Sequence, residues 1–401
     1  MEKFNLFYNA SYLDFLLFLA LIFFFMLVLA YIKLKIKLTT NITFFLFFYH
    51  NLFFLIYTYY QIEIGTDAVS YFLNYEGYER NDISTGRVFL HKLIGYFSAL
   101  NINIHNINYI FSAISFLPFL FFLKIIQELK VYENSKINYY LLISFLFLPS
   151  LHFWISGYSK DTISFIAIFF ISYLYITRVD RQLPQVSNKL FIILLFSLII
   201  LLYSIRPHLA LLMTTSSAIY YFCSKKYSVF NYKFILTLGL GLPIIYFLFT
   251  EVFGNTLNYE NITRIINMYR NLDEPNTGSQ INLDKKYYVF KFILYLFAPN
   301  ILFIQSLNLQ NIIVIIENTF LIFFFLKLFK FRFCNIKSVL FNLIMLILFF
   351  AAMTLITSNL GISNRQKWMA FLPLVITFLY VRYFNEKNLN FSKQIAIKKN
   401  S

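Results

Sequence analysis

Cysteine, glycine, proline and charged residues are all scarce in this sequence. Its 401 residues include 2 cysteines, 10 glycines and 8 prolines, and 13% are charged, whereas a soluble domain is about a quarter charged. Cys223 ends an apolar run and Cys334 lies in a basic segment, so the sequence predicts no disulfide framework. Neither cysteine has the spacing of a metal ligand, and we expect neither a metal nor a cofactor.

Hydrophobic residues account for 59% of the chain, and they form repeated apolar runs of about 20 residues between short polar breaks. Because a bilayer offers no water to the backbone, each crossing segment must satisfy its own N–H and C=O groups, which favours helices. We predict an all-α, polytopic integral membrane protein in which residues 1–401 form a single transmembrane domain. The first run, Tyr12–Ile32, is too long for the apolar part of a cleavable signal and is expected to remain as a span.

The apolar runs predict eleven transmembrane helices and two further apolar segments. Residues 86–100 indicate a short amphipathic helix at the membrane interface. The segment 287–306 is interrupted by Ala298-Pro299-Asn300 and indicates a re-entrant pair or two half-helices. A full crossing there would invert the orientation of everything that follows it. The predicted spans are residues 12–32, 42–62, 106–124, 138–155, 162–177, 190–205, 208–223, 234–252, 311–329, 338–356 and 367–385.

The charges are distributed unevenly over this predicted topology. Lys and Arg together number 34 and Asp and Glu together 18, and most of the basic residues fall in one set of short loops and in the tail 386–401. The positive-inside rule places that set in the cytoplasm, with the N-terminus outside and the C-terminus inside. The excess charge therefore indicates topology and attraction to anionic membrane lipid. A nucleic-acid partner is not expected.

The two longest polar segments, 63–105 and 253–287, lie on the outer face in this topology. The predicted cytoplasmic loops are short and contain neither a Gly-rich phosphate loop nor a paired-Asp motif. Any chemistry would therefore take place outside and use a substrate that is already activated. The segment 253–287 contains Pro275 and Gly278 and is typical of a flap that closes over a substrate.

The first candidate site is in the segment Glu63–Arg87, the densest cluster of carboxylates in the chain. If residues 66–75 are helical, Asp67, Tyr71 and Tyr75 share one face at a spacing of four residues. Asp67 could then act as a general base or hold a sugar hydroxyl. The alternative is a solvated aspartate that caps a short helix.

The second candidate site follows Pro149, which can break a span and free backbone groups for a polar site. Lys160 would offer a cation to a phosphate, and Asp161 would cap the next helix or orient Lys160. The alternative is that Trp154 and Lys160 are interfacial anchors.

The third candidate site is the tight turn that contains Arg206 and His208. Arg206 has no neighbouring acid in the sequence and needs a partner, either a phosphate or a carboxylate such as Asp161 or Asp67. His208 could donate to the same anion or transfer a proton.

Two further candidates lie near predicted spans. Arg365 and Lys367 stand at the outer end of the last span, where headgroup anchoring is the alternative, above all for Lys367. Glu317 is a carboxylate inside a span and so a functional candidate by default, unless it satisfies the broken backbone of 287–306. It could also pair with one of the preceding basic residues, Arg264, Arg270 or Lys291.

These residues together suit one chemistry. The cations Lys160, Arg206 and Arg365 could stabilise a diphosphate leaving group, and a carboxylate or imidazole could serve as the base. Candidates for that catalytic role are Asp67, Asp161 and His208. A lipid-linked diphosphate sugar would supply both the activation and the membrane location.

Several short motifs resemble those of bacterial Wzy-type polysaccharide polymerases, and most closely the EpsG-like branch. They are GTDAVSYFLNY, PSLHFWISGYSKD, YSIRPH, SNRQKW, and the broken LFAPNILFIQSLN followed by IIENTF. Ala298 stands where that group is expected to have a basic residue before the proline, which weakens a phosphate role for this turn.

The resemblance implies a glycosyltransferase of the GT-C kind in the bacterial inner membrane. It would transfer a growing glycan from an undecaprenyl diphosphate carrier to another lipid-linked repeat unit on the periplasmic face, for O-antigen in lipopolysaccharide, capsule or exopolysaccharide. A chain-length regulator and a flippase are the implied partners. The alternatives are another lipid-linked-sugar glycosyltransferase, an O-antigen ligase, or a polysaccharide or lipid flippase or transporter, although the sequence lacks the inverted repeats typical of transporters.

Overall fold

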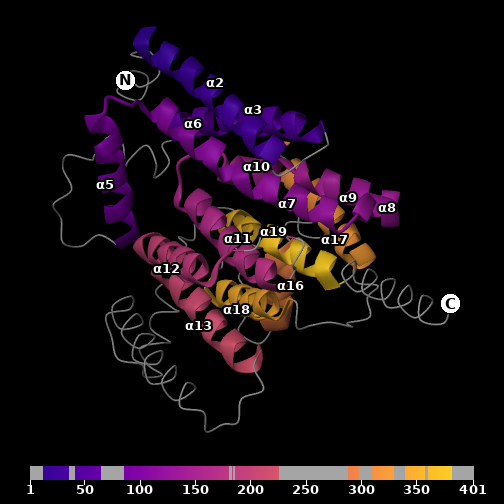
Figure 1. Cartoon of the computed structure of the whole chain (residues 1–401). Helices are drawn as coiled ribbons and strands as arrows, with labels where there is room; N and C mark the ends of the chain where they lie inside the picture. Colours follow the sequence, from indigo (N-terminus) through magenta and orange to yellow (C-terminus); the bar gives the residue numbers. More distant parts are fainter. Residues whose placement is uncertain are drawn as a thin grey trace, which may run out of the picture.

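The computed structural model describes residues 12–35, 41–64, 85–179, 183, 186–224, 288–297, 309–328, 339–356 and 360–381. All regular structure in these ranges is helical, which confirms the all-α prediction (Figure 1). The helices are α2 (Tyr12–Lys35), α3 (Ile42–Ile64), α5 (Thr85–Ala99), α6 (Ile104–Ser115), α7 (Leu117–Glu128), α8 (Val131–Asn134), α9 (Lys136–Leu146), α10 (Pro149–Ile155), α11 (Lys160–Val179), α12 (Asn188–Ile205), α13 (Pro207–Ser224), α16 (Tyr288–Phe297), α17 (Leu309–Leu328), α18 (Leu340–Ile356) and α19 (Leu360–Leu379).

Four helical segments of the described chain are long and apolar enough to cross a membrane. They are Ile42–Gln61, Ile104–Glu128, Lys160–Arg178 and Asn188–Ile205. A fifth is possible if α9 and α10, which are bent by 41° at their break, form one span. These five coincide with predicted spans, so several apolar helices that could cross a membrane are confirmed, which is consistent with a membrane protein.

The predicted count of eleven spans is not supported. The spans 12–32, 311–329 and 338–356 fall on α2, α17 and α18, whose described apolar stretches, Leu16–Ile32, Ile312–Phe324 and Leu340–Thr354, are shorter than the four crossing segments. The spans 208–223 and 367–385 overlap α13 and α19, which are not among the helices apolar enough to cross, because hydroxyl and amide or charged side chains interrupt them. The span 234–252 lies outside the described residues.

The two further apolar segments of the sequence have different outcomes. Residues 86–100 form a helix as predicted, because α5 spans Thr85–Ala99. The segment 287–306 begins with the short helix α16, and residues 298–306 lie outside the described part. Whether this segment crosses the membrane therefore stays a prediction.

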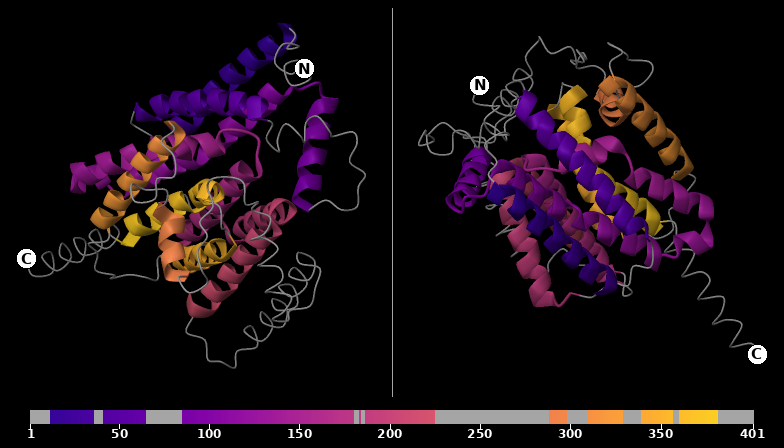
Figure 2. Two further views of the ribbon diagram at one scale, coloured as in Figure 1. Left: turned by 180° about the vertical axis from the view of Figure 1, so that it is seen from behind. Right: turned by 90° about the horizontal axis from the view of Figure 1, so that it is seen from above.

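Helix α11 is the centre of the structure, packed against α6, α7, α10, α12, α18 and α19. Figures 1 and 2 show α2 and α3 on one side of it and α12 and α13 on the other. A helix that is apolar all round belongs in a core, and Phe165, Ile168 and Phe169 of α11 are fully buried. Helix α12 instead exposes large apolar side chains such as Ile192 and Phe196, as expected of a lipid-facing surface. The core thus fixes both ends of α11, and its first turn carries the candidate site.

Candidate functional site

The first turn of α11 is held by hydroxyl groups. The Thr162 N–H donates to Ser159 Oγ at 3.1 Å, so Ser159 supplies the helix cap. The Thr162 hydroxyl donates to the Gly157 carbonyl and closes the turn between α10 and α11. The prediction that Asp161 caps this helix is therefore wrong. Its carboxylate is left available for other partners.

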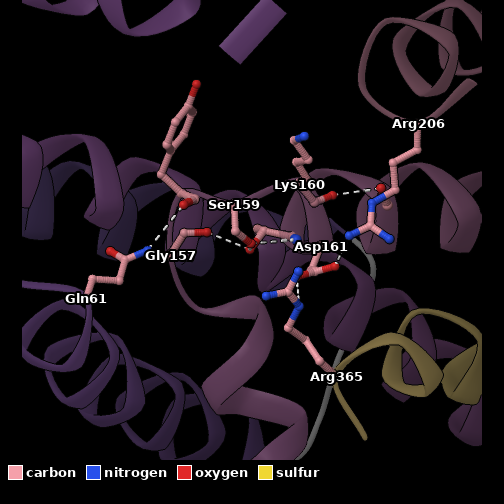
Figure 3. A network of polar contacts seen from close by, with 10 residues as sticks. Gln61, Gly157, Ser159, Lys160, Asp161, Arg206 and Arg365 are labelled. Carbon is pink, nitrogen blue, oxygen red and sulfur yellow. Dashed lines mark hydrogen bonds and ion pairs between the residues drawn. The ribbon is translucent and has the colours of Figure 1, made fainter. Parts of the chain in front are cut away.

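Asp161 forms ion pairs with two arginines (Figure 3). Its Oδ1 atom contacts an Arg206 guanidinium nitrogen, and its Oδ2 atom lies 2.6 Å from Arg365 Nε. The side chains of Asp161 and Arg206 are only 4% and 8% exposed, whereas that of Arg365 is 38% exposed. The structure thus brings together three residues predicted separately, from α11, the α12–α13 turn and α19.

Two more predicted residues adjoin this ion-pair cluster. Lys160 precedes Asp161, and Figure 3 shows its amino group extending away from the Asp161 carboxylate. His208, in the first turn of α13, interacts electrostatically with both Arg206 and Lys160. Three cations and one carboxylate leave this cluster with two net positive charges, which favours a polyanionic ligand. We call Lys160, Asp161, Arg206 and Arg365 the Asp161 cluster.

Two buried tyrosines near this cluster were not predicted from the sequence. Tyr57 of α3 interacts electrostatically with Arg365 and Asp161, and Tyr295 of α16 interacts with Arg206 and Asp161. The Tyr295 hydroxyl is buried and forms no hydrogen bond with any described residue. Because the chain has 31 tyrosines, composition gives no signal that would single these out.

A second polar cluster surrounds Glu317 of α17. The Ser150 N–H donates to Glu317 Oε1 at 2.6 Å, and the Ser150 hydroxyl donates to Oε2. Lys367 Nζ donates to Asn318 Oδ1 at 2.6 Å and to the Leu296 carbonyl at 3.4 Å, and Lys367 interacts electrostatically with Glu317. Lys367 is fully buried, so the prediction that it anchors to headgroups is wrong.

Glu317 satisfies a broken backbone at a place that was not predicted. It caps α10 after the break at Pro149, through Ser150. Residues 298–300 lie outside the described part, so a role of Glu317 at that break stays a prediction. Of its predicted basic partners, Arg264 and Arg270 lie outside the described residues, as does the side chain of Lys291. The described cation near Glu317 is Lys367.

Side chains of the protein hydrogen-bond to the backbone at the break between α9 and α10. The Tyr49 hydroxyl donates to the Phe147 carbonyl at 2.9 Å, and His152 Nε2 lies against the Leu146 carbonyl. His152 Nδ1 is also 2.8 Å from His50 Nδ1 in a buried pair. Pro149 therefore breaks the span as predicted, but side chains of the protein take up the backbone groups that it frees.

The remaining predicted residues cannot be placed. Asp67 and Tyr71 fall in 65–84, and the predicted flap with Arg264 and Arg270 falls in 225–287, all outside the described residues. Their roles stay predictions. Among the described residues there is no group of three or more histidine, cysteine, aspartate or glutamate side chains that could hold a metal ion.

The turn before the Asp161 cluster is anchored by amides. The Tyr158 N–H donates to Asn108 Oδ1 at 2.7 Å, and Asn108 Nδ2 donates to Gln61 Oε1 at 2.9 Å. Gln61 Nε2 in turn donates to the Tyr158 carbonyl at 3.3 Å, which closes a ring of three residues from α3, α6 and the turn. All three side chains are buried, so this ring fixes where α11 begins.

Replacing Gly157 with alanine is expected to disturb this ring and to lower the free energy of unfolding by about 1–3 kcal/mol, as overpacking does. A Cβ atom there would lie 2.5 Å from Tyr57 Cδ1 and 3.1 Å from Asn108 Oδ1. Thermal unfolding in detergent measures the loss, with Ser156→Ala as the control because it removes atoms from the same turn without adding any. Equal stability of Gly157→Ala and the unaltered protein would contradict the packing.

None of the protein-family models, curated proteins or solved structures compared with this chain matches it. Function is therefore inferred from the chemistry of the two clusters, together with the resemblance carried by the sequence motifs.

Proposed function

We propose that this protein is a membrane glycosyltransferase that polymerises lipid-linked oligosaccharide repeat units. It transfers a glycan from an undecaprenyl diphosphate carrier to a sugar hydroxyl of another repeat unit. The reaction takes place on the periplasmic face of a bacterial inner membrane, with the N-terminus periplasmic and the C-terminus cytoplasmic.

The observation that supports this proposal best is the position and charge of the Asp161 cluster. Lys160 begins α11 and Arg206 directly follows α12, so both lie at the same end of two helices apolar enough to cross a membrane. Arg365 reaches the same place from α19 and is more exposed than Asp161 and Arg206, with which it shares the ion-pair cluster. A diphosphate headgroup at this end would meet three cations, while its lipid tail would remain beside apolar helices.

In the proposed reaction the acceptor hydroxyl attacks the anomeric carbon of the donor sugar. The bond between that carbon and the diphosphate oxygen breaks, and the lipid diphosphate leaves with the electron pair. Lys160, Arg206 and Arg365 stabilise the charge that develops on this leaving group. The hydroxyl proton passes to a base, for which Asp67 and His208 are the candidates, while Asp161 holds the two arginines in place.

A ligase or another lipid-linked-sugar glycosyltransferase would expel the same leaving group, so the Asp161 cluster fits those reactions too. The products differ. A polymerase joins repeat units to one another, whereas a ligase joins finished glycan to its surface anchor. A flippase or transporter would move the lipid-linked unit without forming a glycosidic bond.

Deletion of the gene followed by gel analysis of the surface glycan tests the proposal. Loss of a polymerase is expected to leave single repeat units on the surface anchor, whereas loss of a ligase would leave the anchor bare. Long-chain glycan that persists unaltered would overturn the proposal. Complementation with Lys160→Ala or Asp67→Ala, with membrane insertion verified, is expected to restore no long chains.

A further inference from the structure

The two polar clusters are joined through α19. Arg365 contacts Asp161 of α11, whereas Lys367, two residues further along α19, donates to Asn318 of α17. Residues two apart on a helix point about 200° away from each other, so these side chains leave α19 on nearly opposite sides. The first turns of α19 are therefore held between α11 and α17.

The connection continues from α17 to α10. Glu317 is adjacent to Asn318 and accepts both hydrogen bonds from Ser150, at the start of α10. Helix α10 then leads through residues 156–159 into α11 and Asp161. Starting from Asp161, the polar contacts and the chain thus form a closed loop through α19, α17 and α10 back to Asp161.

This arrangement is costly for a purely structural contact. The residues Glu317 and Lys367 are 3% and 0% exposed, and removing two charges from water carries a large desolvation cost. Glu317 and Lys367 interact electrostatically without a direct ion pair, and Asn318, which adjoins Glu317, accepts from Lys367. Replacing buried charges with well-packed apolar residues is often neutral or stabilising, so stability alone does not explain them. Their hydrogen bonds fix the position of the first turn of α10, through Ser150, and of the start of α19, through Lys367.

We infer that Glu317 is a positioning residue, which holds α10 through Ser150 and, together with the adjacent Asn318, holds α19 through Lys367, and thereby sets Arg365 against Asp161. The role in catalysis rests on the proposed function, because the positioned residues are those assigned to the diphosphate. The constraint itself is a property of the fold and can be measured without a substrate.

Glu317→Gln separates the charge of Glu317 from its hydrogen bonds. The amide oxygen can still accept from the Ser150 N–H, and the amide nitrogen can donate to the Ser150 hydroxyl oxygen, so the cap on α10 is kept. The negative charge beside Lys367 is lost. Leu321→Ala is the matched control, because Leu321 lies one turn further along α17, is buried in the apolar core and makes no polar contact with its side chain.

The fluorescence of Trp154 reports where Arg365 lies, because the guanidinium carbon sits 5.9 Å from the centre of that indole ring. The chain has 2 tryptophans, so the emission of Trp154 is obtained by subtracting the spectrum of the same protein with Trp154→Phe. The variant Arg365→Gln gives the reference emission of Trp154 without the neighbouring cation. We expect Glu317→Gln to shift the Trp154 spectrum toward that of Arg365→Gln and Leu321→Ala to leave it unchanged. An unshifted spectrum in Glu317→Gln, or an equal shift in Leu321→Ala, would overturn the inference.

If Glu317→Gln does not accumulate, Lys367→Met tests the same link from the other side and is expected to give the same shift. A second measurement addresses catalysis, using inorganic pyrophosphate as the probe. Glu317→Gln is expected to weaken pyrophosphate binding about tenfold, a change typical of residues that couple distant sites, and Leu321→Ala is not. Failure of the unaltered protein to bind pyrophosphate would count against the proposed function, while the Trp154 spectra would still decide the positioning role.

Discussion

Cells whose only copy of the gene carries Arg206→Ala are expected to make no long-chain glycan. The purified protein is expected to lose about 3–5 kcal/mol of its free energy of unfolding, as buried ion pairs do when one partner is removed. Asp161 is 4% exposed and would keep its contact with Arg365 alone, and the α12–α13 turn would lose its ion pair with α11. Glycan gels measure the first effect, and unfolding in detergent measures the second.

Two further variants make the Arg206 result specific. Arg206→Lys keeps the charge but loses the planar guanidinium, so it should recover part of the stability and little of the chain length. Arg178→Ala removes an exposed arginine that stacks on Phe191 at the opposite end of α11. This control should change neither the free energy of unfolding nor the length of the glycan. Normal glycan in Arg206→Ala cells with fully inserted protein would remove Arg206 from the proposed site.

Part of the Asp161 cluster could be predicted from the sequence. Arg206 has no neighbouring acid in the sequence, so it was expected to need a partner from elsewhere in the chain or from a ligand. The pairing of Arg206 with Asp161 was one of the alternatives that the sequence allowed. Sequence spacing does not reveal that Arg365 shares the same carboxylate, because that contact depends on how α19 packs against α11.

The Glu317 cluster could be predicted only as far as its carboxylate. Lys367 precedes a tryptophan at the end of an apolar run, a pattern typical of interfacial anchors, and only the packing of α19 beside α17 buries it. The backbone partner of Glu317 comes from α10, 167 residues away in the sequence. Tyr57 and Tyr295 carried no signal at all, because their significance lies in which buried charges they adjoin.

For the fold, too, composition predicted the type of structure but not the number of membrane crossings. Apolar composition was enough to predict helices in the described part of the chain, and Pro149 was enough to predict a break. The number of crossings could not be predicted in this way, because polar side chains interrupt some of the helices that form on the predicted spans. The hydroxyl groups of α13 and the amide and charged groups of α19 keep these two helices from being apolar enough to cross.

Asp161→Asn is expected to move ligand binding and activity in opposite directions. The substitution keeps the shape of the side chain and raises the net charge of the Asp161 cluster by one. At an effective dielectric constant of about 20, a unit charge several ångströms away is worth more than about 1.4 kcal/mol, so pyrophosphate should bind about tenfold more tightly at low salt. Long-chain glycan should nevertheless disappear, because Arg206 and Arg365 would keep their charges near the ligand but lose the shared carboxylate that orients both guanidinium groups.

Calorimetric titration with pyrophosphate at two ionic strengths measures the binding, since added salt should shrink the gain as it screens the added charge. Glu133→Gln is the matched control: it removes a carboxylate from the exposed ion pair with Lys130 on α8 and should change neither measurement. Weaker binding in Asp161→Asn would mean that the carboxylate acts mainly by aligning the two arginines. Tighter binding together with normal glycan would mean that the arginines act without Asp161 and would remove Asp161 from the proposed site.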